Sequence, residues 1–454
     1  MMSSATRTRP AGNAPPSAAR TPTGAASSPY RSGGPARGSS GPGRQALPRV
    51  NGRPGHFGSF RLQQLVLIEI AAALLLVAWV IEPLLLVPAG AVATALVLLA
   101  VLRRHRRSLP EWLGTAIALR ARTRRAASLV LPAGTEPGIA PAVECDPALR
   151  TYSFSDRDRR PVGMIGDGTF LTAVLQIESD ATALRPDRSA QPLPLTLVRD
   201  VLDVDGIRLE SAQIVQHTQP APAPHLPPQS VAARNYAPLQ ARTGSPAVRI
   251  TWIALKLDPE LCPEAVQARG GGVEGAQKCL VRAADHLASR LTGAGFRATV
   301  LTEQELTSAI ATSACVSPSA MEQAGRAHTP ARRTEETART WRCDDRRHTT
   351  YWVGRWPQFG GAMSGGGASM PQLVALLTSL PALATTFSLT LGHGDRQEVS
   401  ISGHVRITGR SDEELLTARH ELERTARGVK TSLVRLDREQ LPGVLATLPL
   451  GGTR

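Results

Sequence analysis

The chain has 454 residues and a formal net charge of +15, enough length for two or three domains. The charge is concentrated: residues 1–61 carry nine Arg and no acidic residue, and residues 103–127 carry eight Arg against Glu111 alone. The rest of the chain is nearly neutral, which argues against a nucleic-acid-binding surface. Five cysteines without paired spacing indicate reduced thiols and neither a disulfide framework nor a zinc site.

Residues 1–60 are rich in Pro, Gly, Ser, Ala and Arg and poor in large apolar residues. Such a segment cannot bury enough surface to offset its ordering entropy, so we predict a disordered basic tail. Two roles remain open for it. The tail either binds anionic lipids of the inner leaflet or is a solvated segment that only sets the topology.

Two apolar segments follow, 62–81 (LQQLVLIEIAAALLLVAWVI) and 84–102 (LLLVPAGAVATALVLLAVL). Each has about the 20 residues that a helix needs to cross a bilayer. Glu82 and Pro83 separate them and suit a tight turn. We therefore predict a two-helix transmembrane hairpin at 62–102. A single continuous helix would bury Glu82 and Pro83 in its middle, and a cleaved signal peptide would begin earlier in the chain.

Arginines on both flanks predict the orientation of this hairpin. Positive residues stay on the cytoplasmic side, so we expect both termini in the cytoplasm and a multi-pass protein of the inner (cell) membrane. The arginines nearest the two apolar segments are Arg44, Arg49, Arg53 and Arg61 before the first, and Arg103, Arg104, Arg106 and Arg107 after the second.

Two residues near the membrane are candidates for interactions. Glu69 lies about two turns into the first helix, where a carboxylate costs a few kcal/mol. It contacts a partner helix or a basic side chain of a neighbouring subunit, or it is a neutral acid held within its own hairpin or snorkelling to the interface. Residues 103–127 predict a basic juxtamembrane amphipathic helix, in which Trp112 lies in the headgroup layer or packs into the cytoplasmic domain.

Beyond residue 150 the pattern changes to an α/β (α+β) domain, in which we predict two similar βαββαβ-type halves with a ferredoxin-like order. The closing units support this hypothesis: GFRATVL leads into TEQELTSAI, and GVKTSLV leads into DREQLPGVL. The first predicted strand runs near 162–177 and the last helix near 438–447. The predicted ranges are 150–314 for the first half, 315–346 for a linker or solvated helix, and 347–450 for the second half.

No catalytic, cofactor-binding or metal-binding residue can be assigned. The Gly-rich run at 360–370 lacks the Gly-Lys-Ser/Thr of a phosphate loop. Cys343, Asp344, Asp345 and His348 cluster in sequence, but their spacing matches no ligand pattern. Three tryptophans lie close together and mark either a contact surface or core packing around the strand near 348–355: Trp341, Trp352 and Trp356.

The order of these parts resembles EccE, a membrane subunit of the actinobacterial type VII (ESX) secretion system. The resemblance rests on RLQQLVLIEIAAALLLVAW, on the second helix with its LLLVP start, and on LPEWLGTAIALR after the basic flank. It implies a part in a membrane complex with EccB, EccC (the ATPase motor) and EccD, which exports small helical-hairpin proteins. It carries over no catalytic residue.

Two functions follow as expectations. The first is a non-catalytic structural subunit that supports assembly of the secretion complex. The second is a membrane-tethered enzyme or small-ligand-binding module. A cleft lined by converging acids, His or Lys would favour the second.

Overall fold

The computed structural model describes part of the chain, and backbone alone is described for 56–57, 60–67, 98–101, 103–104 and 107–112. Residues 1–55 of the predicted tail lie outside it. The described elements fall in one compact unit, Pro48–Arg454. The described ranges are 56–57, 60–82, 84, 86–101, 103–104, 107–132, 134–156, 159–179, 192–220, 229–231, 234–235, 248–326, 331–357, 369–394 and 398–452.

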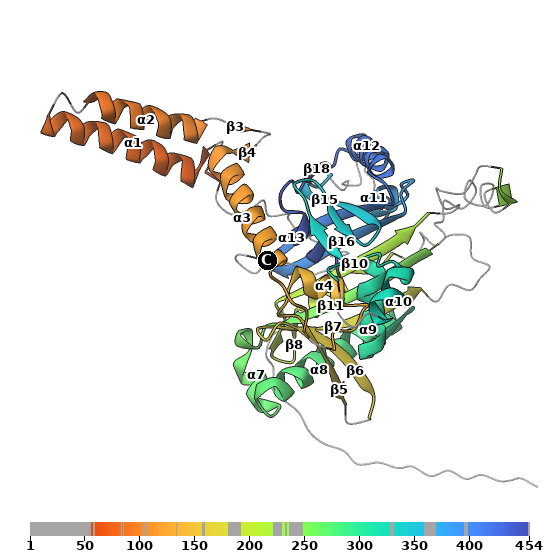
Figure 1. Cartoon of the computed structure of the whole chain (residues 1–454). Helices are drawn as coiled ribbons and strands as arrows, with labels where there is room; N and C mark the ends of the chain where they lie inside the picture. The colour runs from red at the N-terminus through yellow and green to blue at the C-terminus, as the bar shows by residue number, and fades with distance from the viewer. Residues whose placement is uncertain are drawn as a thin grey trace, which may run out of the picture. The chain divides into compact units, whose positions relative to one another are not determined.

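Two helices form an antiparallel hairpin at the N-terminal end of the described chain (Figure 1). They are α1 (Leu62–Ile81) and α2 (Leu86–Val101). Pairs of short strands stand on either side, and two further helices lead into the rest of the chain. These elements are β1 (His56–Phe57), β2 (Phe60–Arg61), β3 (Arg103–Arg104), β4 (Arg107–Ser108), α3 (Leu109–Ala127) and α4 (Ala140–Cys145).

A 12-stranded antiparallel sheet organises the remainder as a mixed α/β domain. Its first half contains β5 (Arg150–Ser155), β6 (Pro161–Gly166), β7 (Leu171–Ser179), α5 (Leu195–Asp200), β10 (Ser211–Gln219), β11 (Val248–Leu257), α8 (Gly272–Gly293), β12 (Phe296–Val300) and α9 (Glu303–Ser313). Small elements between these are β8 (Asp203–Val204), β9 (Ile207–Arg208), η3 (Pro259–Leu261) and α7 (Pro263–Ala268).

The second half repeats this order of elements. It contains β13 (Thr334–Glu336), β14 (Trp341–Cys343), β15 (Arg346–Arg355), α11 (Met370–Thr378), β16 (Ala384–His393), β17 (Val399–Gly409), α12 (Asp412–Gly428), β18 (Ser432–Arg435) and α13 (Gln440–Leu445). One helix, α10 (Pro318–Arg326), lies between the halves.

Strand pairing is also the same in both halves. In the first, β7 pairs with β6, β12 and β11, and β11 pairs with β10. In the second, β15 pairs with β14, β18 and β17, and β17 pairs with β16. Each βαββαβ unit therefore has the strand order 4-1-3-2. The outer strands β10 and β16 pair with each other, from Ser211 opposite Gly392 to Thr218 opposite Thr385, and so join the halves into one sheet.

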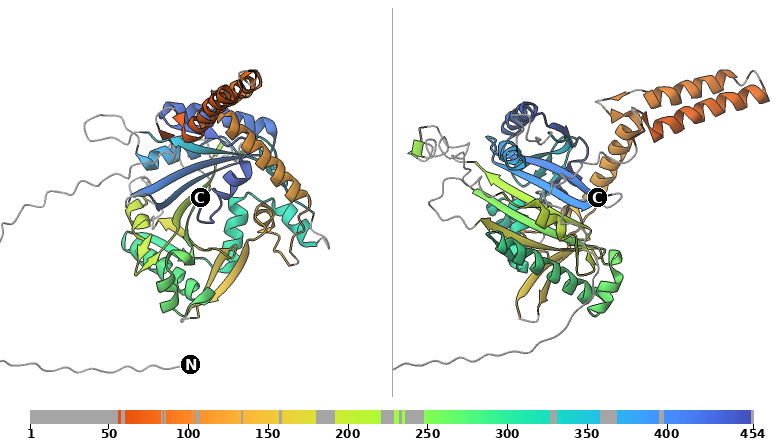
Figure 2. Two further views of the ribbon diagram at one scale, coloured as in Figure 1. Left: turned by 90° about the vertical axis from the view of Figure 1, so that its left-hand side faces the viewer. Right: turned by 180° about the vertical axis from the view of Figure 1, so that it is seen from behind.

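Apolar side chains cover both faces of the sheet, because its strands alternate between two cores. One core receives α5, α8, α11 and α12, with Leu280, Leu287, Leu415 and Leu422 fully buried. The opposite core receives α4, α9 and α13, with Leu306, Ile310 and Val444 fully buried. Figure 2 shows these helices on the two sides of the strands.

Residues 315–346 differ from the predicted linker, since they contain α10 and the strands β13 and β14. Thr334 and Glu336 point inward from β13, so polar residues occupy positions where an apolar pattern would have signalled a strand. The strand predicted near 162–177 is two strands, β6 and β7. Between them the Asp167 carboxylate accepts hydrogen bonds from the Thr169 and Phe170 amides and thereby stabilises a turn.

The last described residues, Leu448–Gly452, cross the first half and are named the C-terminal strap. Thr172 donates its hydroxyl to the Leu450 carbonyl over 3.0 Å, and Ser211 donates to the Gly451 carbonyl over 2.6 Å. The Gly451 amide donates to Gln213 Oε1 over 2.8 Å. Gly451 has φ +90°, and a Cβ there would lie 2.5 Å from Cβ of Lys256, so this position requires glycine.

Candidate interaction sites

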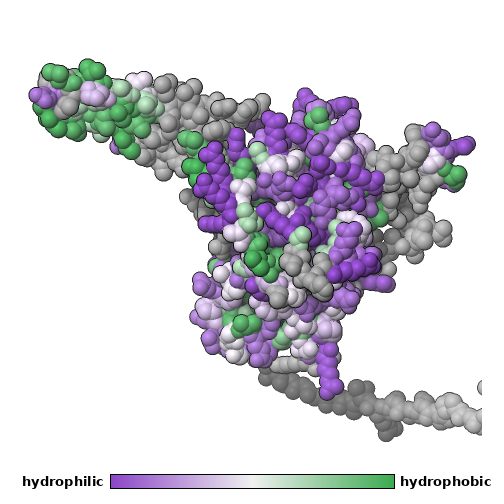
Figure 3. Space-filling model, in the orientation of Figure 1, coloured by the Kyte–Doolittle hydropathy of each residue, from purple (hydrophilic) through white to green (hydrophobic). Residues whose placement is uncertain are grey.

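The hairpin packs small residues inward and exposes large apolar ones. Among the residues of α1 and α2 whose side chains are described, the buried ones are Ala71, Ala78, Ala89 and Ala93. Val80, Leu84 and Val87 are 78%, 83% and 80% exposed, and Figure 3 shows the hydrophobic surface that such residues form. Small residues at a helix–helix contact with large apolar residues outside are typical of helices packed in lipid. Among the described residues, no helix combines the length and the apolarity needed to span a bilayer.

The two predicted interaction residues lie on different helices. Glu69 is exposed on α1, between Ile68 and Ile70, which are exposed as well. Trp112 lies on α3, and its side chain is outside the described part of the structure. The roles of both residues stay predictions.

Arg122 connects α3 to the sheet. Its Nε and Nη2 donate to the two carboxylate oxygens of Glu336 over 2.8 and 3.0 Å, and Nη2 also donates to the Arg438 carbonyl over 2.6 Å. The Glu336 side chain, on β13, is only 3% exposed, and it also accepts from the Leu441 amide at 3.0 Å. This bidentate geometry fixes the direction as well as the position of Arg122.

A second buried network holds β13 against α4. The Glu144 carboxylate accepts from the backbone amides of Arg333 and Thr334 and from the Thr334 hydroxyl, over 2.6 to 3.1 Å. Arg333 forms a bidentate ion pair with Asp344, with both bonds at 2.8 Å. Burial disfavours the charge of Arg333, but the hydrogen bonds and attraction from Asp344 outweigh it and raise its pKa. These residues and the Arg122–Glu336 pair are named the β13 anchor.

The anchor accounts for part of the sequence cluster at 343–348. Asp344 pairs with Arg333, His348 Nδ1 lies 2.9 Å from the Thr408 hydroxyl, and Cys343 is buried. Among the described residues, no group of three or more His, Cys, Asp or Glu could hold a metal ion.

Two of the three tryptophans belong to the core. Trp341 and Trp356 are 1% and 8% exposed, and the Trp356 ring meets the Phe387 ring edge-on with centroids 6.5 Å apart. Trp352 is half-buried on β15. These positions favour core packing over a contact surface.

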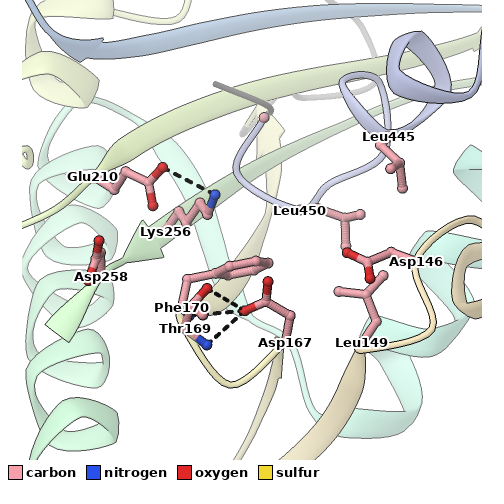
Figure 4. A pocket seen from close by; sticks show the side chains of 11 residues that line it. Asp146, Leu149, Asp167, Thr169, Phe170, Glu210, Lys256, Asp258, Leu445 and Leu450 are labelled. Atoms are coloured by element: carbon pink, nitrogen blue, oxygen red, sulfur yellow. Dashed lines mark hydrogen bonds and ion pairs between the residues drawn. The ribbon is translucent and has the colours of Figure 1, made fainter. Parts of the chain in front are cut away.

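A pocket of about 290 Å³ lies beside the C-terminal strap (Figure 4). Lys256 Nζ lies 3.2 Å from Glu210 and 4.1 Å from the centroid of the Phe170 ring, so its charge is compensated on two sides. Burial raises the pKa of Asp167, but hydrogen bonds from Thr169 and Phe170 outweigh it and lower that pKa overall. The lining residues are Asp146, Leu149, Asp167, Thr169, Phe170, Glu210, Lys256, Asp258, Leu445, Leu450 and Gly452.

This pocket partly meets the criterion for a ligand-binding module, because acids and one lysine converge on it. Its volume is at the lower end of small-molecule sites. Four acids surround one compensated lysine, so the pocket disfavours phosphate groups. The lining contains neither His nor Cys, so it offers none of the commonest groups for proton transfer or nucleophilic attack near neutral pH.

Comparison with known families gives one match. The model of a family described as putative type VII ESX secretion system translocon, EccE, matches residues 245–353. The match confirms the resemblance to EccE that the sequence showed. It begins just before β11, runs through α8 and α9, and ends within β15, so it includes Arg333, Glu336 and Asp344. No curated protein matches the chain.

Proposed function

Given this match to a type VII secretion translocon family, we propose that the protein is a non-catalytic structural subunit of a type VII secretion membrane complex. The observation that carries the proposal is the match over 245–353, which includes β11 to α9 of the first half and most of the β13 anchor. The subunit supports assembly of a machine that exports small helical-hairpin proteins. Its partners are the other subunits, EccB, EccC and EccD.

The hairpin α1–α2 holds this subunit in the cell membrane. Its exposed apolar residues, which include Trp79, Leu84 and Val87, would contact lipid tails, and its alanines let the two helices approach closely. The arginines on both flanks keep both termini in the cytoplasm and attract anionic lipids of the inner leaflet. Glu69 in the hairpin and Trp112 in α3 are the candidate contact residues of this part of the protein.

In this proposal the α/β domain is the part of the protein to which the neighbouring subunits bind. Its repeated strand order supports an origin by duplication of one βαββαβ unit. The Arg122–Glu336 pair of the β13 anchor ties it to α3, so a position fixed in the membrane is passed to the sheet through a bidentate ion pair rather than through a loose linker.

The alternative is a membrane-tethered enzyme or small-ligand-binding module, for which the pocket beside the strap is the specific observation. A ligand of that pocket must tolerate four carboxylates. Titration of the purified full chain with polyamines and with uncharged sugars, which carry no phosphate, followed by calorimetry, tests this alternative, and saturable binding would support it.

Extraction of the tagged full chain from native membranes in a mild detergent tests the leading proposal. We expect a particle much larger than the 48.2 kDa chain that contains other type VII subunits. A variant lacking residues 62–102 should lose that particle. A variant lacking residues 1–40, which keeps the apolar segments, is the control and should retain it. A full chain that migrates alone in several mild detergents would contradict the proposal.

A further inference from the structure

Arg406 on β17 is a fully buried cation in the centre of the second half. It lies opposite Thr350 of β15 and Thr386 of β16, and Thr386 in turn lies opposite His217 of β10. Its Nη2 donates to the Ser313 carbonyl and to the Thr386 hydroxyl. Its Nε and Nη1 have no hydrogen-bond partner among the described residues.

The charge of Arg406 is poorly compensated by the protein. Burial lowers its pKa, and the groups that oppose this effect are thiols of Cys315, Cys343 and Cys145, not carboxylates. Burial also raises the pKa of Cys315 despite its attraction to Arg406, so that thiol stays neutral at physiological pH. A guanidinium without a counter-ion in the interior is costly.

A second unpartnered donor lies on the same face of the sheet. Cys315 donates its S–H to the Thr408 hydroxyl oxygen over 3.6 Å. The Thr408 O–H in turn donates to His348 Nδ1 over 2.9 Å. Burial and the nearby Arg406 hold the pKa of His348 well below its ordinary value, so the ring is neutral. Its proton is therefore on Nε2, which has no partner within the described part of the chain.

These two side chains are neighbours. His348 lies opposite Thr408, two residues along β17 from Arg406, and alternate residues of a strand point to the same face. Four N–H donors therefore lack an acceptor: Arg406 Nε–H, the two N–H groups of Arg406 Nη1, and His348 Nε2–H.

The long segment that follows His217, residues 220–247, contains no Asp or Glu and so offers no carboxylate counter-ion for Arg406. The segment that follows Trp356, residues 357–368, contains none either. The neighbouring side chains Thr350, Thr386 and Trp341 are at most 1% exposed. An interior packed at this density leaves no room for a peptide segment beside these side chains.

We propose that Arg406 and His348 bind a small inorganic anion of halide size on the face of the sheet that α9 and α13 cover. The anion compensates the guanidinium and accepts the hydrogen bond from His348. Its binding is thereby linked to the folded state of the second half, since the unfolded chain does not bring β15 and β17 together.

Thermal unfolding of the full chain in detergent tests this proposal. Sodium gluconate is exchanged for sodium chloride or bromide at constant ionic strength and pH 7.5. We expect the Tm to rise by about 3 °C for each tenfold increase in halide above its Kd. Arg406→Gln should abolish the halide response, whereas the control Arg347→Gln should keep it. Arg347 lies on β15 and pairs with Asp412, which is 77% exposed.

Equal Tm values in gluconate and in chloride for the native chain would overturn the proposal. A halide response that persists in R406Q would overturn it as well, because it would place the ion elsewhere. If R406Q does not fold, His348→Ala provides the comparison. It should raise the chloride concentration at half-effect about tenfold, and an unchanged half-effect would contradict a role for His348.

Discussion

At the scale of single residues, the clearest interactions are charge pairs that the sequence could not reveal. Arg122 and Glu336 are 214 positions apart, and neither lies in a motif. Arg122 is one of four arginines in α3, and nothing in its spacing separates it from Arg124 or Arg125. A buried glutamate in a short polar strand is likewise indistinguishable from a solvated one until its partner is known.

Replacing Arg122 should weaken the connection between α3 and the sheet. Arg122→Ala leaves the nearly buried Glu336 carboxylate without its bidentate partner, so we expect the free energy of unfolding to fall by about 2 kcal/mol. Urea unfolding followed by tryptophan fluorescence measures this change. Arg124→Ala, at an exposed position of the same helix, is the control. Equal stability of the two variants would show that the pair contributes little.

Buried histidines should make stability depend on pH. Burial lowers the pKa of His217 to about 3 and that of His404 to about 4, and it lowers the pKa of His348 well below its ordinary value. Between pH 6.5 and 5 the unfolded chain therefore binds protons that the folded chain does not. Stability should fall as the pH is lowered through this range, by up to about 1.4 kcal/mol per pH unit for each histidine.

The slope of unfolding free energy against pH, from urea titrations between pH 7.5 and 5, measures this dependence. His217→Asn should reduce the slope by the amount that corresponds to the uptake of about one proton on unfolding. His420→Asn, on the exposed side of α12, should not change the slope. A native chain with constant stability over this range would refute the prediction.

At the scale of elements, periodicity and capping chemistry predicted most of what the structure contains. Thr302 forms a capping box with Glu305 at the start of α9, and the Ser411 side chain accepts from the Glu414 amide at the start of α12, and both pairs have the Ser/Thr-x-x-Glu spacing that is visible in the sequence. The helical stripe at Leu280, Ala284, Leu287 and Leu291 is buried. β13 was missed because its inward-facing Thr334 and Glu336 break the apolar alternation on which strand prediction depends, and β14 was missed because its three residues are too few to show one.

The C-terminal strap was not predicted either, since its stability comes from partners in the first half. Deletion of residues 448–454 should leave the hydroxyls of Thr172 and Ser211 without acceptors and Gln213 Oε1 without the Gly451 donor in the interior. We expect a loss of about 3 kcal/mol or more, measured as a lower urea midpoint. Deletion of 453–454 alone is the control, and an unchanged midpoint in the longer deletion would contradict the assigned role of the strap.

At the scale of the whole molecule, the sequence predicted two βαββαβ units but not how they meet. Weak likeness between the closing units indicated the repeat. The pairing of β10 with β16 depends on two outer strands whose mutual register no local pattern encodes. The sequence likewise predicted the hairpin and the α/β domain, but it could not predict the β13 anchor between them, because no local pattern encodes contacts between distant residues.

Our central proposal is that the protein supports a type VII secretion complex from within the membrane. Cross-linking of the full chain in native membranes, followed by mass spectrometry of the linked peptides, tests it most directly. We predict links from the α/β domain and from the hairpin flanks to other type VII subunits, and loss of these links when residues 62–102 are removed. Links confined to unrelated proteins, or unchanged links without the hairpin, would contradict the account.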